Sequence, residues 1–78
     1  MKLLVRNLAR TTIQADVQAL FEKHGTVEYC TLVMDAKTGQ SKGFGFVEMP
    51  QDTEATAAIQ ALNGRKIDNS KIRVKAAE

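Results

Sequence analysis

The chain has 78 residues, enough for one hydrophobic core, so we expect residues 1–78 to form a single domain. Apolar runs such as Leu3–Val5 are far shorter than the roughly 20 residues of a membrane-spanning helix. The net charge of +2 only weakly favours a polyanionic partner, so the placement of the charges matters more than their sum.

The first predicted element is a strand over Lys2–Arg6, because its side chains alternate in character. Leu3 and Val5 fall on one face, while Leu4 falls on the other with the two basic residues. This alternation is typical of a strand with one buried face.

A helix is predicted next, because apolar residues from Ile13 to Phe21 recur at helical spacing. Its start is expected near residues 11–13, where Thr11 and Gln14 have the spacing of a capping box. Gly25 is expected to end it as the C′ residue, which favours positive φ.

The second predicted strand is Val27–Met34, rich in β-branched residues. Val27, Cys30 and Leu32 are its expected core positions, and an irregularity near Glu28 is needed if all three face inward. Cys30 has no second cysteine to pair with, so we expect a small core residue rather than a reactive thiol.

A turn-rich loop over residues 35–41 leads into the third predicted strand, Lys42–Met49, which Pro50 stops. Phe44 and Phe46 are two residues apart and therefore share one face. Hydrophobicity alone allows either face of this strand to be the buried one.

A second helix is predicted over Thr53–Leu62 with Asp52 as its cap, followed by a turn at residues 68–69 and a last strand over Lys71–Lys75. The element order β-α-β-β-α-β favours an α+β, two-layer, ferredoxin-like sandwich. We expect a four-stranded antiparallel sheet with both helices on one face.

The alternation of charged and apolar residues along the strands decides which sheet face is buried. One register buries aliphatic residues, whereas the opposite register buries five lysines and arginines. Burying an unpaired charge costs several kcal/mol, more than the roughly 2–3 kcal/mol gained per buried phenylalanine. We therefore expect six inward residues: Leu3, Val5, Val47, Met49, Ile72 and Val74.

The outward face then carries exposed aromatics among cations, which suits unpaired nucleic acid. Its expected basic residues outnumber its one carboxylate, Glu48. The candidate RNA-binding residues are Lys2, Leu4, Arg6, Asn7, Tyr29, Thr31, Lys42, Phe44, Phe46, Glu48, Lys71, Arg73, Lys75 and Ala76.

Two stretches resemble the signature motifs of RNA recognition motif (RRM) domains. KGFGFVEM over residues 42–49 resembles RNP1, and LLVRNL over residues 3–8 resembles the shorter RNP2. The resemblance spans the whole chain, is close to small single-RRM bacterial proteins, and implies that the two motif strands are adjacent in the centre of the sheet.

The resemblance implies a role for individual residues. Phe46 matches the aromatic that stacks under a base, Phe44 the one that packs between riboses, and Lys42 the residue that contacts a phosphate. Arg6, Arg73 and residues 75–77 match positions that make polar contacts to bases or phosphates. Two residues depart from the motifs of the family. Met49, where RNP1 usually ends in an aromatic residue, is expected in the core, and Leu4 stands where RNP2 usually has an aromatic residue.

Several alternatives stay open. Phe44, Phe46 and Leu4 could instead form a protein-binding patch. Tyr29 is either a solvent-side residue or an added stacking group, and Glu48 either accepts from a base amino group or pairs with a neighbouring cation.

No His/Cys/carboxylate cluster or phosphate-cradling loop supports an enzyme, so we expect a binding domain without catalytic residues, metal or cofactor. The expected partner is single-stranded RNA, and single-stranded DNA is left open. The expected oligomeric state is a monomer. The lone cysteine and the lack of room for a signal peptide before Leu3 favour a cytoplasmic setting, or a nuclear one in a eukaryote.

Overall fold

The computed structural model describes residues 1–77, which form two helices and six strands. The main elements follow the predicted β-α-β-β-α-β order, and a short hairpin of two further strands lies before the last one. In chain order they are β1 (Lys2–Arg6), α1 (Gln14–Glu22), β2 (Tyr29–Met34), β3 (Ser41–Glu48), α2 (Asp52–Leu62), β4 (Lys66–Ile67), β5 (Ser70–Lys71) and β6 (Arg73–Ala76).

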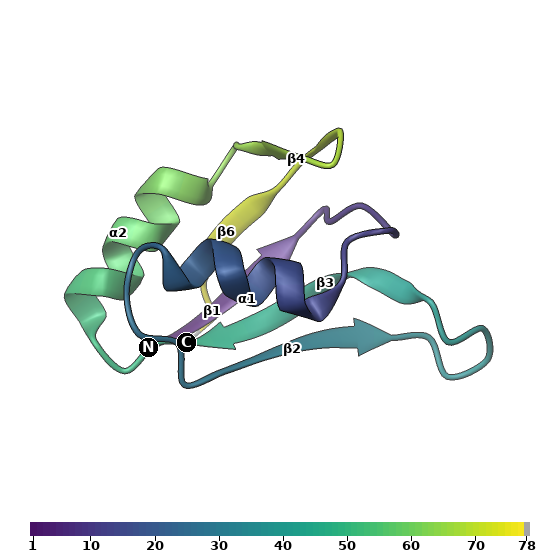
Figure 1. The fold of residues 1–78 in the computed structure, drawn as a ribbon, viewed down its shortest axis with the longest axis horizontal. Coiled ribbons are helices and arrows are strands. Elements are labelled where there is room, and N and C mark those ends of the chain that lie inside the picture. Colours follow the sequence, from purple (N-terminus) through teal and green to yellow (C-terminus); the bar gives the residue numbers. More distant parts are fainter. Residues whose placement is uncertain (78) are drawn as a thin grey trace.

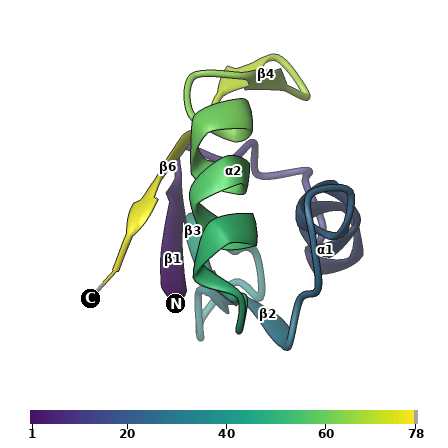
Figure 2. The same cartoon turned by 90° about the vertical axis from the view of Figure 1, so that its left-hand side faces the viewer.

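The sheet has the antiparallel order β2-β3-β1-β6, so the two motif strands, β1 and β3, are its central pair. Both helices lie on the same side of this sheet (Figure 1), and the edge-on view separates the helix layer from the sheet (Figure 2). The expected α+β ferredoxin-like sandwich is confirmed. Neither helix in residues 1–77 is long and apolar enough to cross a membrane.

The core lies between the sheet and the helices, as the alternation of charged residues along the strands predicted. All six aliphatic side chains assigned to the inward face are at most 2% exposed, including Met49. Phe21 and Val17 of α1 and Leu62 of α2 cover them from the helix layer. The opposite face is therefore left open to solvent.

Cys30 belongs to this core rather than to a reactive site. Its side chain is 5% exposed, and burial raises the pKa of its thiol to about 11, with a further contribution from the carboxylate of Glu22. A thiol with such a pKa carries almost no thiolate at neutral pH, and it is therefore a poor nucleophile.

Gly45 sets the close approach of β2 to β3. A Cβ atom at this position would collide with the backbone oxygen of Thr31 and press on the side chain of Leu32.

The irregularity expected near Glu28 lies instead between Leu32 and Met34, and β2 begins only at Tyr29. Val27 precedes the strand and packs half-buried against the core.

The predicted cap of α1 is wrong. The helix begins at Gln14 with Ile13 as its N-cap, and no side chain caps it. Gln14 Oε1 instead accepts a hydrogen bond from the backbone N–H of Leu32 on the edge strand β2, at 3.1 Å. Ile13, expected on the buried helix face, is 58% exposed, because the N-cap lies outside that face.

The other predicted helix ends shift by one or two residues. The C-cap of α1 is Lys23, so Gly25 lies two residues beyond it rather than at C′. The N-cap of α2 is Gln51, which makes Asp52 the first helical residue instead of the cap. An acidic side chain in the first turn still interacts favourably with the helix dipole.

The last predicted strand, Lys71–Lys75, is divided. Residues 66–71 form the β4–β5 hairpin, whose turn residues Asp68 and Asn69 both have positive φ, as a two-residue type I′ turn requires. Ile72 separates the hairpin from β6 and is fully buried. Lys71 therefore lies in the hairpin, outside the main sheet, and not on the strand face where it was predicted.

Candidate nucleic-acid interface

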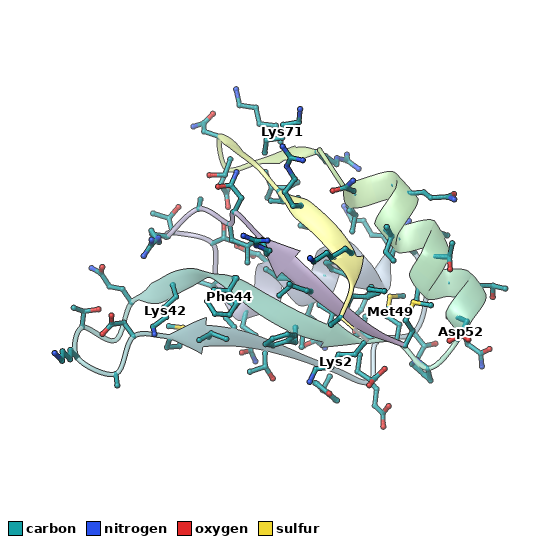
Figure 3. The ribbon with its side chains drawn as sticks, turned by 180° about the vertical axis from the view of Figure 1, so that it is seen from behind. Lys2, Lys42, Phe44, Met49, Asp52 and Lys71 are labelled. Carbon is teal, nitrogen blue, oxygen red and sulfur yellow. The ribbon has the colours of Figure 1, made fainter. Side chains whose placement is uncertain are left out.

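The open face of the sheet carries Phe44 and Phe46 side by side. Their ring centroids are 6.4 Å apart and the rings meet edge to face at 85°. Both side chains are half-buried, whereas Gly45 between them and Val47 after them are buried. Figure 3 shows Phe44 on this face beside Lys42. The predicted orientation of the RNP1-like strand is confirmed.

A row of side chains crosses the open face through Phe46. Thr31 is the β2 partner of Phe46, Leu4 is its β1 partner, and Lys75 is the β6 partner of Leu4. The row thus joins a hydroxyl, an aromatic ring, an apolar side chain and a cation over four strands. Leu4 stands where a second aromatic ring would lie directly beside Phe46.

Lys2 lies over Phe46. Its Nζ is 4.7 Å from the centroid of the ring, a distance typical of a cation–π interaction. Such a contact is worth about 0.5–1 kcal/mol at an exposed site. Stacking of a base on an aromatic ring is worth about 1–3 kcal/mol.

Glu48, the carboxylate of the open face, pairs with a cation. Its Oε2 is 3.0 Å from the amino group of Met1, which also donates a 2.7 Å hydrogen bond to the backbone oxygen of Met49. Of the two roles left open for Glu48, the structure shows the ion pair. Tyr29 is the β2 partner of Glu48 and is 43% exposed, so its ring borders this end of the face.

Like charges face each other at the opposite end of the sheet. Arg6 on β1 and Arg73 on β6 are direct cross-strand partners, and both are exposed. Like charges directly opposite each other destabilise a sheet, and an anion bound between them relieves the repulsion. Within residues 1–77, neither arginine forms an ion pair with a carboxylate. This arrangement favours a polyanionic ligand.

Three further predicted residues lie around the face. Asn7 has a φ of 60°, and its Nδ2 donates a 2.7 Å hydrogen bond to the backbone oxygen of Lys71, which fixes the hairpin to the end of β1. Figure 3 shows Lys71 before the start of β6, away from Phe44. Ala76 is the β6 partner of Leu3 at the exposed sheet edge.

Arg10 lies at this end of the face and was not predicted from the sequence. Its Nη1 donates a 3.0 Å hydrogen bond to the backbone oxygen of Ser41, which brings the loop after β1 against the start of β3. Arg10 thereby joins Arg6 and Lys42 in lining a pocket of about 290 Å³ next to Phe44. A loop residue follows no periodic pattern, so only the tertiary contact reveals it.

The fold and this surface define a binding domain of the kind that displays aromatic and basic side chains on an open sheet. Residues 3–73 match the RNA recognition motif family, and the chain belongs to that family. Its members are binding domains, which confirms the prediction that the protein is not an enzyme.

Two relatives illustrate the range of lengths in which this domain occurs. The chain is 40% identical over its whole length to the putative RNA-binding protein RbpA of Synechocystis sp., of which it covers 77%. It is 45% identical over 97% of its length to the chloroplastic 29 kDa ribonucleoprotein B of Nicotiana sylvestris, but it spans only 26% of that protein. The expected cytoplasmic setting stays a prediction.

Solved structures are similar over the full fold. The chain matches the crystal structure of RNA-binding protein PG1 with a TM-score of 0.95 and 35% identity, covering all of this chain and 95% of that one. It matches a chain from a Sex-lethal protein–RNA complex with a TM-score of 0.93 and 31% identity, covering 99% of this chain and 46% of that one.

Proposed function

We propose that the domain binds single-stranded RNA across the open face of its sheet, with limited sequence selectivity. The observation that carries this proposal is the pair Phe44 and Phe46, half-exposed on a face whose cross-strand arginines form no ion pair with a carboxylate of residues 1–77. Family membership and relatives named as RNA-binding proteins support RNA as the ligand.

The proposal assigns different work to each part of the face. A base stacks on Phe46 after displacing Lys2, Phe44 packs against the sugars, and Leu4 offers apolar contact to a neighbouring base. The flanking cations contact phosphates, and the polar groups of β6 and residues 75–77 meet base edges. RNA and single-stranded DNA of one sequence, titrated in parallel, would show whether the ribose hydroxyl contributes.

The affinity expected from these contacts is modest. A micromolar complex needs about 8 kcal/mol, whereas one base stacked on Phe46 supplies about 1–3 kcal/mol. Phosphate contacts must provide the remainder, so binding should weaken as salt increases. We therefore expect micromolar or weaker dissociation constants at physiological ionic strength.

Salt dependence measures the phosphate contribution. With about three phosphates engaged, the logarithm of the affinity should fall with the logarithm of the salt concentration at a slope of about −2. Fluorescence anisotropy of a labelled single-stranded octamer between low and physiological salt gives this slope. A flat dependence would instead favour the apolar patch as a protein-binding surface.

Replacing Leu4 by phenylalanine should strengthen RNA binding. The new ring would lie beside its cross-strand partner Phe46 and extend the stacking surface by one base. The expected gain is about three- to tenfold, since a second stacked base replaces apolar contact. Anisotropy titrations of the variant and wild type would measure it. Weaker binding by a folded Leu4→Phe variant would mean that a base does not lie over β1.

A further inference from the structure

The pocket beside Phe44 differs from the aromatic face in its chemistry. It lies where β1 ends and β3 begins, and most of its lining surface is polar. Three cations line it, Arg6, Arg10 and Lys42, and each comes from a different part of the chain. Asn7, Gly43 and Phe44 are among the residues that complete it.

The part of the chain that the structure describes supplies no carboxylate counter-ion to the cations around the pocket. None of the three forms an ion pair with a carboxylate in residues 1–77. Arg73 lies beside Arg6 on the neighbouring strand and adds positive charge at the same end of the sheet. Holding several unneutralised cations together costs stability, and an anion bound between them removes that cost.

Arg10 is held in place from one side only. Its Nη1 donates to the backbone oxygen of Ser41, and no other hydrogen bond of its guanidinium group occurs in residues 1–77. An arginine side chain has five N–H donors in a fixed plane, so several donors are left for a ligand. The planar fork matches the geometry of phosphate oxygens.

Gly43 allows this close arrangement. Its φ is +87°, and a Cβ at this position would lie 3.2 Å from the backbone oxygen of Leu8 and 3.5 Å from Arg10 Nε. The backbone oxygen of Gly43 also accepts a 2.8 Å hydrogen bond from the N–H of Leu8. The loop that carries Arg10 is thus fixed to β3 by backbone as well as side-chain contacts.

We infer that Arg6, Arg10 and Lys42 form a subsite for a backbone phosphodiester of the bound RNA. The inference rests on the proposed function, because an RNA strand that crosses Phe44 would reach this pocket, which Phe44 also lines. It adds Arg10 to the RNA-binding residues and places one end of the RNA path at the loop between β1 and α1. The subsite recognises phosphate charge, not base identity.

Replacing Arg10 by glutamine tests the subsite. We expect a five- to tenfold loss of affinity for a single-stranded octamer and a salt slope less steep by about 0.7, the value for one phosphate contact on a single strand. An Arg10→Lys variant, which keeps the charge, should retain the wild-type slope. Lys23→Gln, an equal change of charge on an exposed position of the helix layer, should alter neither quantity.

The salt slope separates phosphate binding from bracing of the loop. If Arg10 only held Ser41, Arg10→Gln would weaken binding without changing the slope, and that result would overturn the inference. Equal affinities of the octamer with and without a 5′-phosphate are expected for an internal phosphodiester; strong dependence on the terminal phosphate would contradict it. If wild type binds RNA and Arg10→Gln has the same affinity and salt slope, the phosphate subsite is refuted while the proposed function stands. Absence of any binding by wild type would refute the proposed function itself.

Discussion

Phe46→Ala should weaken the binding of single-stranded RNA at least tenfold while leaving the domain folded. The ring is the centre of the row that crosses all four strands, and stacking of one base on it is worth about 1–3 kcal/mol. Its loss removes only half-buried surface, an edge contact with Phe44 and a cation–π contact with Lys2. Anisotropy titration gives the affinity, and circular dichroism verifies the fold.

Ile13→Ala is the matched control for this variant. Ile13 is also an exposed apolar residue, but it lies at the start of α1 in the helix layer. Its truncation should leave RNA affinity unchanged. If the folded Phe46→Ala protein binds RNA as tightly as wild type, the stacking model is wrong.

Phe21→Ala should have the opposite pattern, a large loss of stability with little effect on the binding surface. Phe21 is fully buried between α1 and the sheet, and truncating such a ring costs about 3–5 kcal/mol. A domain of this size is stable by on the order of 4–12 kcal/mol in total. We expect the melting temperature to fall by at least roughly 12 °C.

Urea unfolding followed by circular dichroism measures this loss. Phe21→Leu, which keeps most of the side-chain volume, should lose much less stability and should bind RNA with wild-type affinity. An unfolding midpoint of Phe21→Ala close to that of wild type would mean that α1 is not packed on the sheet as described. Phe46→Ala and Phe21→Ala thus test the open face and the covered face of the sheet separately.

The orientation of the sheet could be predicted from sequence because strands repeat every two residues. Once β1 and β6 had to keep their lysines and arginines in water, Phe44 and Phe46 could only face outward. The buried positions Leu3, Val47 and Val74 followed from the same rule. The alternation of apolar and charged residues can be read within each strand, and the buried and exposed faces of the fold agree with it.

The helix caps could not be predicted in this way. A side chain that could cap its own helix can form a better contact with a distant strand, as Gln14 does with Leu32. Thr12 behaves similarly, since its hydroxyl donates a 2.7 Å hydrogen bond to Asp68 in the β4–β5 turn. Capping signals lie within a few residues, whereas these partners lie 18 and 56 residues away.

The candidate site was predicted where it lies on strands and missed where it lies on a loop. Arg6 and Lys42 were found by strand parity, but Arg10 enters the site only through its contact with Ser41. Lys71 was misplaced because two-residue strands such as β4 and β5 are too short to produce a periodic pattern. The type I′ turn at residues 68–69 was the remaining signal of that hairpin.

Chemical-shift mapping of the ¹⁵N-labelled domain with short single-stranded RNA tests the central claim most directly. If RNA lies on the open face, the largest shifts should occur in β1 and β3, centred on Leu4 and Phe46, with further shifts at Arg10 and Lys75. The exposed side of α2 should be unaffected. Shifts confined to the two helices, or no shifts at millimolar RNA, would contradict binding on the open face.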